Sequence, residues 1–428
     1  MAEALDRLLT DLGERSTYDA VSQCSRCGYC EQSCPTYLAT GEESKSPRGR
    51  NQLLRQLIEG KLADRASAEE AFSTCLLCGA CQTACYARVP VPDLALEGRR
   101  LLRGAPHPLV KLVTRWQVER PGLLRLLLKA GFLMKRLGLS RLGRPFLRRV
   151  GLPVLAAMDE HVDDAPLEFA DEALARKPQS ASPAWLYYPP CGPRYLHTEV
   201  ADATWTSLTA LLGPGALLKA GCCGLLAHNY GDLEDARVQA RALIEAAEGA
   251  GSAPIVGDCS SCVAHLKSYP QLFLKPEDAS WRARAAAFSA RVRDALEVYR
   301  EKAPALGLAP ESGVVTWHDS CRGLNGSGLK EGGRPALKAL CPEGFRELGG
   351  AGECCGGAGA YAFVHDALSD EVLRRKVAAI ASTQAAVVVA SSTSCLIQLA
   401  RGLKTYYPEA KALHLSQFVA RSVDKHGS

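Results

Sequence analysis

Eight of the eighteen cysteines in this chain form two runs with the same spacing, C-x2-C-x2-C-x3-C. This spacing is typical of [4Fe-4S] ligands, because three closely spaced thiolates wrap one cubane while the fourth reaches the other cluster. The first cluster is therefore expected on Cys24, Cys27, Cys30 and Cys85. The second is expected on Cys34, Cys75, Cys78 and Cys81. These runs predict a helical N-terminal domain, over residues 1–98, that two clusters hold together.

Two other uses of the cysteines fit less well. A disulfide framework is typical of short secreted chains, and residues 1–10 have neither a basic start nor the apolar stretch of a signal peptide. Structural zinc favours C-x2-C pairs separated by a long gap, whereas each run here has four cysteines at cluster spacing. We therefore expect a cytoplasmic protein, since free thiolates that receive iron persist in a reducing compartment.

A helix is predicted between the two cysteine runs. Ser46 suits the N-cap, Pro47 suits the first helical position and Gly60 suits the stop. The apolar residues between them recur at helical spacing, at Leu53, Leu54, Leu57 and Ile58. With 428 residues the chain can build two or three domains, and it contains no run of 18 or more apolar residues that would cross a membrane.

Residues 99–150 are strongly basic, with fourteen Lys or Arg against the single acid Glu119. Leucines interleave with Arg125 and Lys129, which predicts helices with one apolar and one cationic side. Such a segment suits a membrane surface or an acidic partner, and it equally suits a helical connector with a solvated basic face. Nucleic acid is not expected, because no aromatic stacking platform or base-reading motif accompanies the charge. We expect a basic helical connector over residues 99–180.

The second half contains an internal repeat. The first copy has Cys191, Cys222, Cys223, Cys259 and Cys262, and the second has Cys321, Cys354, Cys355 and Cys395. The matching cysteines lie 130, 132 and 133 residues apart, which indicates two copies of one module, over residues 181–310 and 311–428. Adjacent cysteines can be small buried hydrophobes, but the matched offsets favour a metal centre in each copy.

Short apolar runs precede the cysteines of each copy, at residues 185–188, 254–256, 314–317 and 386–390. Each resembles a buried strand that is followed by helix-like sequence, which predicts parallel α/β units. Ligands gather beyond the carboxyl ends of parallel strands, so the cysteines of each copy should converge there. The fold class is therefore α/β (α+β overall): a helical two-cluster ferredoxin-like domain and two tandem parallel α/β modules.

The two copies differ at one position. Ser392 stands where Cys259 would align, so the second copy has four cysteines and the first has five. Four thiolates suffice for a cubane or for zinc. We expect additional iron-sulfur centres in these modules, with zinc as an alternative in one of them.

Several motifs together resemble a known family. The segments are CSRCGYCEQSCPTY at 24–37, SPRGR at 46–50 and CCGGAGAY at 354–361. The chain resembles the glycolate oxidase iron-sulfur subunit family over nearly its whole length, and its Cys-Cys-Gly segments resemble the CCG domain of heterodisulfide reductase. In those reductase relatives, the five-cysteine pattern holds a non-cubane cluster. The resemblance therefore suggests an unusual cluster in the first module, with a conventional centre or none in the second.

The resemblance implies an electron-transfer subunit rather than a catalytic one. A separate FAD-containing subunit would oxidise a 2-hydroxy acid such as glycolate or D-lactate, and electrons would pass through this chain to a quinone or another carrier. The basic segment would make a peripheral membrane or quinone contact on the inner face. A heterodisulfide reductase-like disulfide or quinone reductase is the alternative.

The chain shows no catalytic set of its own. It has no G-x-G-x-x-G dinucleotide motif after a strand. His228, Asp258, His318 and Asp319 lie near cysteines but form no recognisable acid-base pair. His318 and Asp319 are instead expected to orient the loop before Cys321 by hydrogen bonding.

Overall fold

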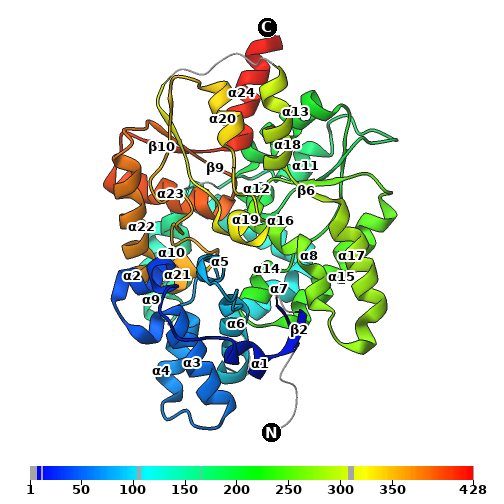
Figure 1. The fold of residues 1–428 in the computed structure, drawn as a ribbon. Helices are drawn as coiled ribbons and strands as arrows, with labels where there is room; N and C mark the ends of the chain where they lie inside the picture. The colour runs from blue at the N-terminus through cyan, green and yellow to red at the C-terminus, as the bar shows by residue number, and fades with distance from the viewer. Residues whose placement is uncertain (1–6, 11–12, 104–107, 164, 307–312, 428) are drawn as a thin grey trace.

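The computed structural model describes residues 7–10, 13–103, 108–163, 165–306 and 313–427. It is mixed α/β, with a helical N-terminal part, a helical connector and two small parallel sheets (Figure 1). This confirms the fold class expected from the sequence. Among the described residues, no helix has both the length and the apolar character needed to cross a bilayer.

The N-terminal part, at the bottom of Figure 1, is helical apart from one antiparallel hairpin. The hairpin, which was not expected from the sequence, consists of β1 (Arg7–Thr10) and β2 (Gly13–Ser16). The helices are α1 (Thr17–Ser22), η1 (Glu31–Ser33), α2 (Pro35–Thr40), η2 (Glu43–Lys45), α3 (Pro47–Ile58), α4 (Arg65–Ser73), α5 (Ala80–Ala84) and α6 (Val91–Arg103).

Helix α3 is the helix predicted between the cysteine runs. The Ser46 hydroxyl caps it by accepting a hydrogen bond from the Gly49 amide at 2.9 Å, and Pro47 occupies the first turn. Leu54 is fully buried, while Leu53, Leu57 and Ile58 pack against the same core. Gly60 follows with a φ of +70°, the left-handed conformation expected at a helix stop.

The connector is helical, as expected. It consists of α7 (Pro108–Glu119), α8 (Pro121–Arg136), α9 (Ser140–Arg149), α10 (Pro153–His161) and α11 (Ala170–Leu174). Helices α8 and α9 contain the interleaved leucines and cations of the basic segment.

The first module is built on the parallel sheet β4-β3-β5-β6. Its strands are β3 (Leu186–Tyr188), β4 (Ala216–Leu217), β5 (Ile255–Gly257) and β6 (Val292–Asp294). Its helices are α12 (Cys191–Tyr195), α13 (Thr198–Leu212), α14 (Leu225–Asn229), α15 (Leu233–Gly249), α16 (Ser260–Lys267), η3 (Tyr269–Leu272), η4 (Pro276–Asp278), α17 (Ala279–Arg291), α18 (Ala295–Lys302) and η5 (Ala303–Leu306).

The second module repeats this topology in the parallel sheet β8-β7-β9-β10. Its strands are β7 (Val315–Trp317), β8 (Phe345–Arg346), β9 (Val387–Ala390) and β10 (Lys411–His414). Its helices are α19 (Cys321–Gly326), α20 (Arg334–Leu340), α21 (Tyr361–Val364), α22 (Asp366–Ala381), α23 (Thr393–Tyr406) and α24 (Leu415–Gly427).

The two sheets keep the offsets read from the cysteines. Leu186 pairs with Ile255 in the first module, and Thr316 pairs with Val388 in the second, at offsets of 130 and 133 residues. The two modules also share one apolar core, in which Trp185 and Trp205 of the first meet Trp317 and Phe418 of the second. Helices α13 and α24 lie side by side across this junction (Figure 1).

Candidate metal centres

The cysteines of the N-terminal part lie in loops with a recurring backbone shape. Cys24, Cys27 and Cys30 follow α1, and Cys75 and Cys78 follow α4, while Cys34, Cys81 and Cys85 lie on or beside the short helices that come next. Arg26 and Leu77, one residue before the second cysteine of each run, have φ values of 62° and 53°. Gly28 and Gly79, one residue after it, have φ values of 81° and 78°. These left-handed residues curl each loop, so that successive thiols face one centre.

The thiols fall into two groups that cross between the runs. Burial, together with the charges of Cys24 and Cys85, raises the pKa of Cys30 to about 11. Burial also raises the pKa of Cys81 well above its ordinary value, followed by the effects of Cys78, Cys75, Cys34 and Cys30. Cys85 of the second run thus lies near the first group and Cys34 of the first run near the second, while Cys30 and Cys81 bring the two groups close together. The assignment of these cysteines as cluster ligands stays a prediction.

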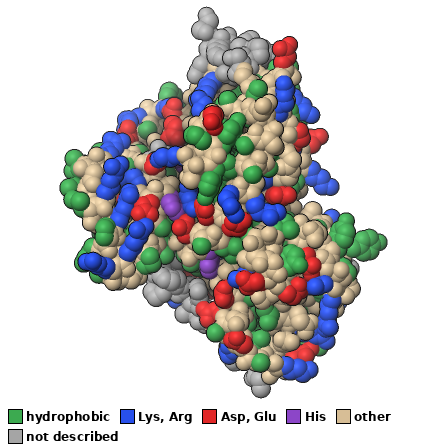
Figure 2. All heavy atoms as spheres, turned by 90° about the vertical axis from the view of Figure 1, so that its left-hand side faces the viewer, with side chains coloured by type: hydrophobic (Ala, Val, Ile, Leu, Met, Phe, Trp, Pro, Cys, Tyr) green, Lys and Arg blue, Asp and Glu red, His purple; other side chains and the backbone are tan. Residues whose placement is uncertain are grey.

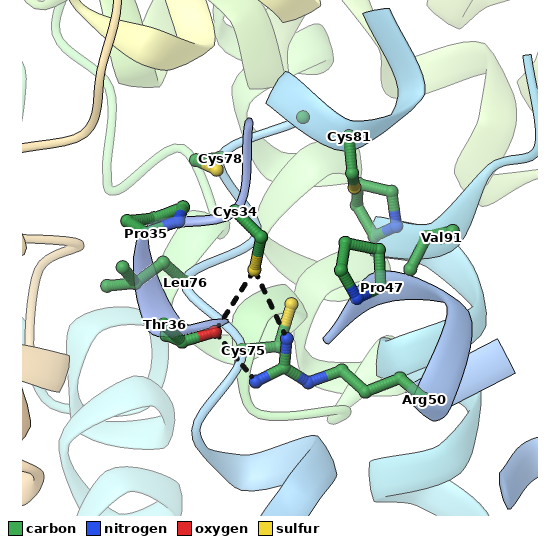
Figure 3. Close-up of a pocket in the computed structure, with 12 residues that line it drawn as sticks. Cys34, Pro35, Thr36, Pro47, Arg50, Cys75, Leu76, Cys78, Cys81 and Val91 are labelled. Carbon is green, nitrogen blue, oxygen red and sulfur yellow. Dashed lines mark hydrogen bonds between the residues drawn. The ribbon is translucent and has the colours of Figure 1, made fainter. Parts of the chain in front are cut away.

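The second group lines a pocket that Figure 3 shows, with Cys34, Cys75, Cys78 and Cys81 among the lining residues. Four thiols are the donor set that a [4Fe-4S] cluster requires. Burial raises the pKa values of Cys78 and Cys81 well above the ordinary value, and such thiols keep their protons unless a metal replaces them. The residues present therefore fit a [4Fe-4S] cluster in chemistry.

Arg50 is the buried cation of this pocket, with a side chain only 2% exposed. Its guanidinium donates to the Ala71 carbonyl at 2.7 Å, to the Thr36 hydroxyl at 3.1 Å and to the Thr74 hydroxyl at 3.3 Å. It also approaches the Cys34 sulfur at 3.9 Å (Figure 3). Its role was not predicted, although it is the last residue of the Ser-Pro-Arg-Gly-Arg segment.

The first module brings its five cysteines together beyond the carboxyl ends of β3 and β5. Cys191 begins α12, Cys222 and Cys223 lie in the turn before α14, and Cys259 and Cys262 lie at the start of α16. Hydrogen bonds link their thiols. The pKa of Cys259 is lowered to about 6 by its hydrogen bonds with Cys262 and Ser392, which outweigh the effect of burial. A thiol with a lowered pKa is readily available as a thiolate ligand.

Ser392, which replaces the fifth cysteine of the second module, faces the first module instead. Its hydroxyl lies 3.5 Å from the Cys259 sulfur and 2.9 Å from the Ser261 hydroxyl. Beside it, the Ser260 hydroxyl donates to that of Ser391 at 2.8 Å, and the Ser260 amide donates to the Ser391 carbonyl at 2.9 Å. We call these four serines the serine seam. Through it, each module contacts the cysteine-bearing loop of the other.

The second module also gathers its cysteines. The Cys321 and Cys354 sulfurs lie 4.0 Å apart, and the Cys355 thiol is hydrogen-bonded to those of Cys354 and Cys395. His318 joins this group, because one of its ring nitrogens lies within 4.8 Å of the Cys355 and Cys395 sulfurs.

The expectation that His318 and Asp319 orient the loop by hydrogen bonding holds for only one of them. The Asp319 carboxylate accepts from the Trp317 indole at 2.5 Å and from the Arg334 guanidinium at 2.9 Å. His318 is fully buried, and neither of its ring nitrogens has a hydrogen-bond partner. For His318 the expectation is wrong, because its ring faces sulfur atoms rather than the loop.

The N-terminal domain packs against the second module, and cysteines from both lie at the contact. Cys78 lies in one apolar cluster with Cys354, Tyr361 and Val372, and the partly buried Cys321 packs against it. The Asn325 amide donates to the Cys78 carbonyl at 3.0 Å, and the Tyr361 hydroxyl donates to the Thr74 carbonyl at 3.0 Å. The second group of ferredoxin cysteines is thus a direct neighbour of the second-module cysteines.

Asp258 and His228, the other titratable residues that the sequence places near cysteines, lie in separate surroundings. The Asp258 carboxylate accepts from the Tyr187 and Thr204 hydroxyls, and burial raises its pKa to about 7. Burial lowers the pKa of His228 to about 3, and its ring packs 4.9 Å from that of His265. Asp258 lies beyond β5, whereas His228 belongs to α14.

Comparisons with known proteins agree with this domain order. A 4Fe-4S dicluster domain matches residues 20–89, and a cysteine-rich CCG domain matches residues 185–267 and 315–400. The chain is 28% identical to the probable glycolate oxidase iron-sulfur subunit of Bacillus subtilis, over 97% of both chains. It is 28% identical to the glycolate oxidase iron-sulfur subunit of Escherichia coli, over 94% of both.

A shorter relative matches part of the chain. The lactate utilization protein A of Oceanobacillus iheyensis is 26% identical over 46% of this chain and 80% of its own length. The matched domains contain the cysteine groups described above: the N-terminal runs lie in the dicluster domain, and the cysteines of the two repeats lie in the two CCG domains. The chain is a homologue of the glycolate oxidase iron-sulfur subunits over nearly its whole length, with one 4Fe-4S dicluster domain followed by two CCG domains.

Proposed function

We propose that this chain is the iron-sulfur electron-transfer subunit of a flavin-dependent 2-hydroxy-acid dehydrogenase complex. A partner subunit with FAD would oxidise glycolate or D-lactate, and this chain would relay the electrons to a quinone or another carrier. Iron-sulfur clusters supply the one-electron steps that such a relay needs. The observation that carries the proposal is the contact between Cys78 and the Cys321–Cys354 pair, since it joins the N-terminal cysteines to a CCG module.

The proposed ligand sets follow the thiol groups described above. Cys24, Cys27, Cys30 and Cys85 would hold one cluster, and Cys34, Cys75, Cys78 and Cys81 the other. Cys27 is exposed, and Tyr29 and Tyr86 beside this group are also exposed. This surface supports electron exchange with a partner protein through the first group, because exposed aromatic side chains are favoured at interfaces.

The test is to purify the tagged chain without oxygen from its own organism. We expect a flavoprotein to co-purify and the visible absorbance of the clusters to bleach when glycolate or D-lactate is added. A complex that oxidises neither acid, or a chain that carries no flavoprotein, would contradict the proposal. Reduction of disulfides by the isolated chain with a strong electron donor would instead favour the heterodisulfide reductase-like alternative.

We also propose that α8 and α9 contact an anionic membrane surface, where quinone is available. Several basic side chains of these helices are already paired: Arg125 with Asp171 and Glu172, and Arg144 with Asp159. Charged and apolar side chains are mixed over the face in Figure 2, without one large area of a single sign. The apolar side chains therefore carry the argument, with Leu142 78% and Phe146 65% exposed on α9.

A vesicle experiment tests this contact. The double variant Leu142→Ser/Phe146→Ser should bind phosphatidylcholine–phosphatidylglycerol vesicles at least about tenfold more weakly, because two apolar side chains no longer leave water. The double variant Val238→Ser/Val364→Ser, which changes exposed apolar residues elsewhere, should bind like the wild type. Equal sedimentation of all three proteins with the vesicles would contradict the proposal.

A further inference from the structure

The second CCG module contains a buried imidazole with no polar partner. His318 immediately follows β7, is fully buried, and has two ring nitrogens without a hydrogen bond. A buried polar group without a partner destabilises the folded protein. Such a cost is normally offset by a ligand or an ordered solvent molecule at the site.

The surroundings of His318 are sulfur atoms. One ring nitrogen and the sulfurs of Cys355 and Cys395 all lie within 4.8 Å of one another. In a tetrahedral zinc site two ligand atoms lie about 3.5–3.8 Å apart, since Zn–S bonds are about 2.3 Å and Zn–N bonds about 2.0–2.1 Å long. The three atoms therefore need to approach one another by at most about 1 Å to share one metal ion, which side-chain rotations can supply. Both cysteines are buried, at 1% and 6% exposure, so water does not compete freely for them.

The backbone explains why these three residues meet. Strands β7 and β9 are adjacent and parallel, and the His318 amide donates to the Val389 carbonyl at 2.9 Å. Cys395 lies in the first turn of α23, directly beyond β9. His318 and Cys395 thus leave the same edge of the sheet on neighbouring strands.

The first module has a different residue at this position. Tyr188 stands three residues before Cys191, as His318 stands three residues before Cys321. The Tyr188 hydroxyl donates to the Gly221 carbonyl at 3.1 Å, so Tyr188 has a partner and offers no nitrogen. Conversely, the first module has Cys259, whereas Ser392 of the second module points across the serine seam. The second module therefore lacks one thiolate and has one imidazole in exchange.

We infer that His318 is a direct metal ligand, so that the second CCG module holds a centre with mixed imidazole and thiolate ligands. Two kinds of centre accept both sulfur and nitrogen ligands: a zinc ion, and an iron-sulfur cluster with histidine ligation. Both fit the donor atoms of this site. Buried Lys376 lies near the same thiols: burial lowers the pKa of its ammonium group, against the effects of Glu353 and of Cys355, Cys354 and Cys395. The inference rests on the metal-binding part of the proposed function and not on the partner subunit.

The test compares iron, zinc and acid-labile sulfide per chain in the full-length protein, purified without oxygen. His318→Leu should lose the metal of the second module and keep the iron of the N-terminal clusters. His318→Cys should retain the metal, because a thiolate replaces the nitrogen donor. His414→Leu is the matched control, since His414 is also buried with one unpartnered ring nitrogen but does not belong to the cysteine group.

The metal lost from His318→Leu also identifies the centre. Loss of zinc indicates a mononuclear site, whereas loss of iron with sulfide indicates a cluster. In the wild type, pulsed EPR should detect a nitrogen coupled to the reduced cluster, or X-ray absorption should detect imidazole bound to zinc. Wild-type metal content in His318→Leu, equal loss in His414→Leu, or metal content unaffected by Cys355→Ala with Cys395→Ala would each overturn the inference.

These outcomes separate the inference from the proposed function. A chain that couples to no flavoprotein but loses metal in His318→Leu keeps the inference and rejects the function. If the wild-type chain couples to hydroxy-acid oxidation but His318→Leu keeps all of its metal, the proposed function stands and the inference is rejected.

Discussion

A Cys81→Ala variant is expected to contain about four fewer iron atoms per chain than the wild type, because a cubane that loses one of four thiolates in this pocket is no longer held. Cys81 is only 9% exposed and packs in the same core as Leu77, Val91 and Leu94. Water cannot easily take the place of the missing ligand there. Electron transfer from a reduced donor to the terminal acceptor should fall to background.

Cys341→Ala is the matched control for this prediction. Cys341 is 1% exposed, but it lies in the apolar core shared by the two modules, away from the cysteine groups. Its replacement should cost about 1 kcal/mol of stability and no iron. Iron and sulfide analysis and the EPR spectrum of the reduced protein measure the difference. Equal iron in Cys81→Ala and the wild type would reject the second ferredoxin site.

Replacing Arg50 should make the reduction potential of the neighbouring cluster more negative. A reduced cluster carries one more negative charge, so a nearby buried cation stabilises the reduced form. Arg50→Leu should therefore lower the potential by about 60 mV or more, which equals a tenfold change in a one-electron equilibrium. It should also cost about 3 kcal/mol of stability, because the donors to Ala71, Thr36 and Thr74 are lost.

Two further variants separate charge from structure. Arg50→Lys keeps the cation but loses most of the hydrogen bonds, so its potential should stay close to that of the wild type while its stability falls. Arg55→Leu removes an arginine from the same helix that forms a partly exposed pair with Glu59, and it should change neither the potential nor, by more than about 0.5 kcal/mol, the stability. Redox titration monitored by EPR gives the potentials. An unchanged potential in Arg50→Leu would contradict the electrostatic role.

The elements that the sequence predicted well are those fixed by local rules. The cap at Ser46, the stop at Gly60 and the four central strands each depend on a few adjacent residues with strong preferences. The repeat was also readable, because a duplicated sheet preserves the spacing between residues at equivalent strand ends. The outer strands β4, β6, β8 and β10 were not expected, nor was the short hairpin near the N-terminus, which has no Asn-Gly or Asp-Gly pair to indicate it.

The features that could not be predicted depend on contacts between distant segments. Ser392 was expected to be a ligand position that the second module had lost, but the fold directs its hydroxyl toward Cys259, 133 residues away. Arg50 acquires its role only when Thr36 and Thr74 close around it. The sequence predicts one hydrogen-bonding role for both His318 and Asp319, although the two side chains have different neighbours. Spacing along a chain carries no information about such orientations.

The serine seam has a consequence for how the two modules can change over time. After a duplication, two copies can diverge independently only where each folds around a core of its own. Here Ser392 contacts a candidate ligand of the other copy, and Ser260 is bonded to Ser391 across the junction. The effect of a substitution in one module therefore depends on which residues the other module has at the serine seam. We expect epistasis between positions 259–261 and 391–392, so these two short segments should co-evolve as a unit.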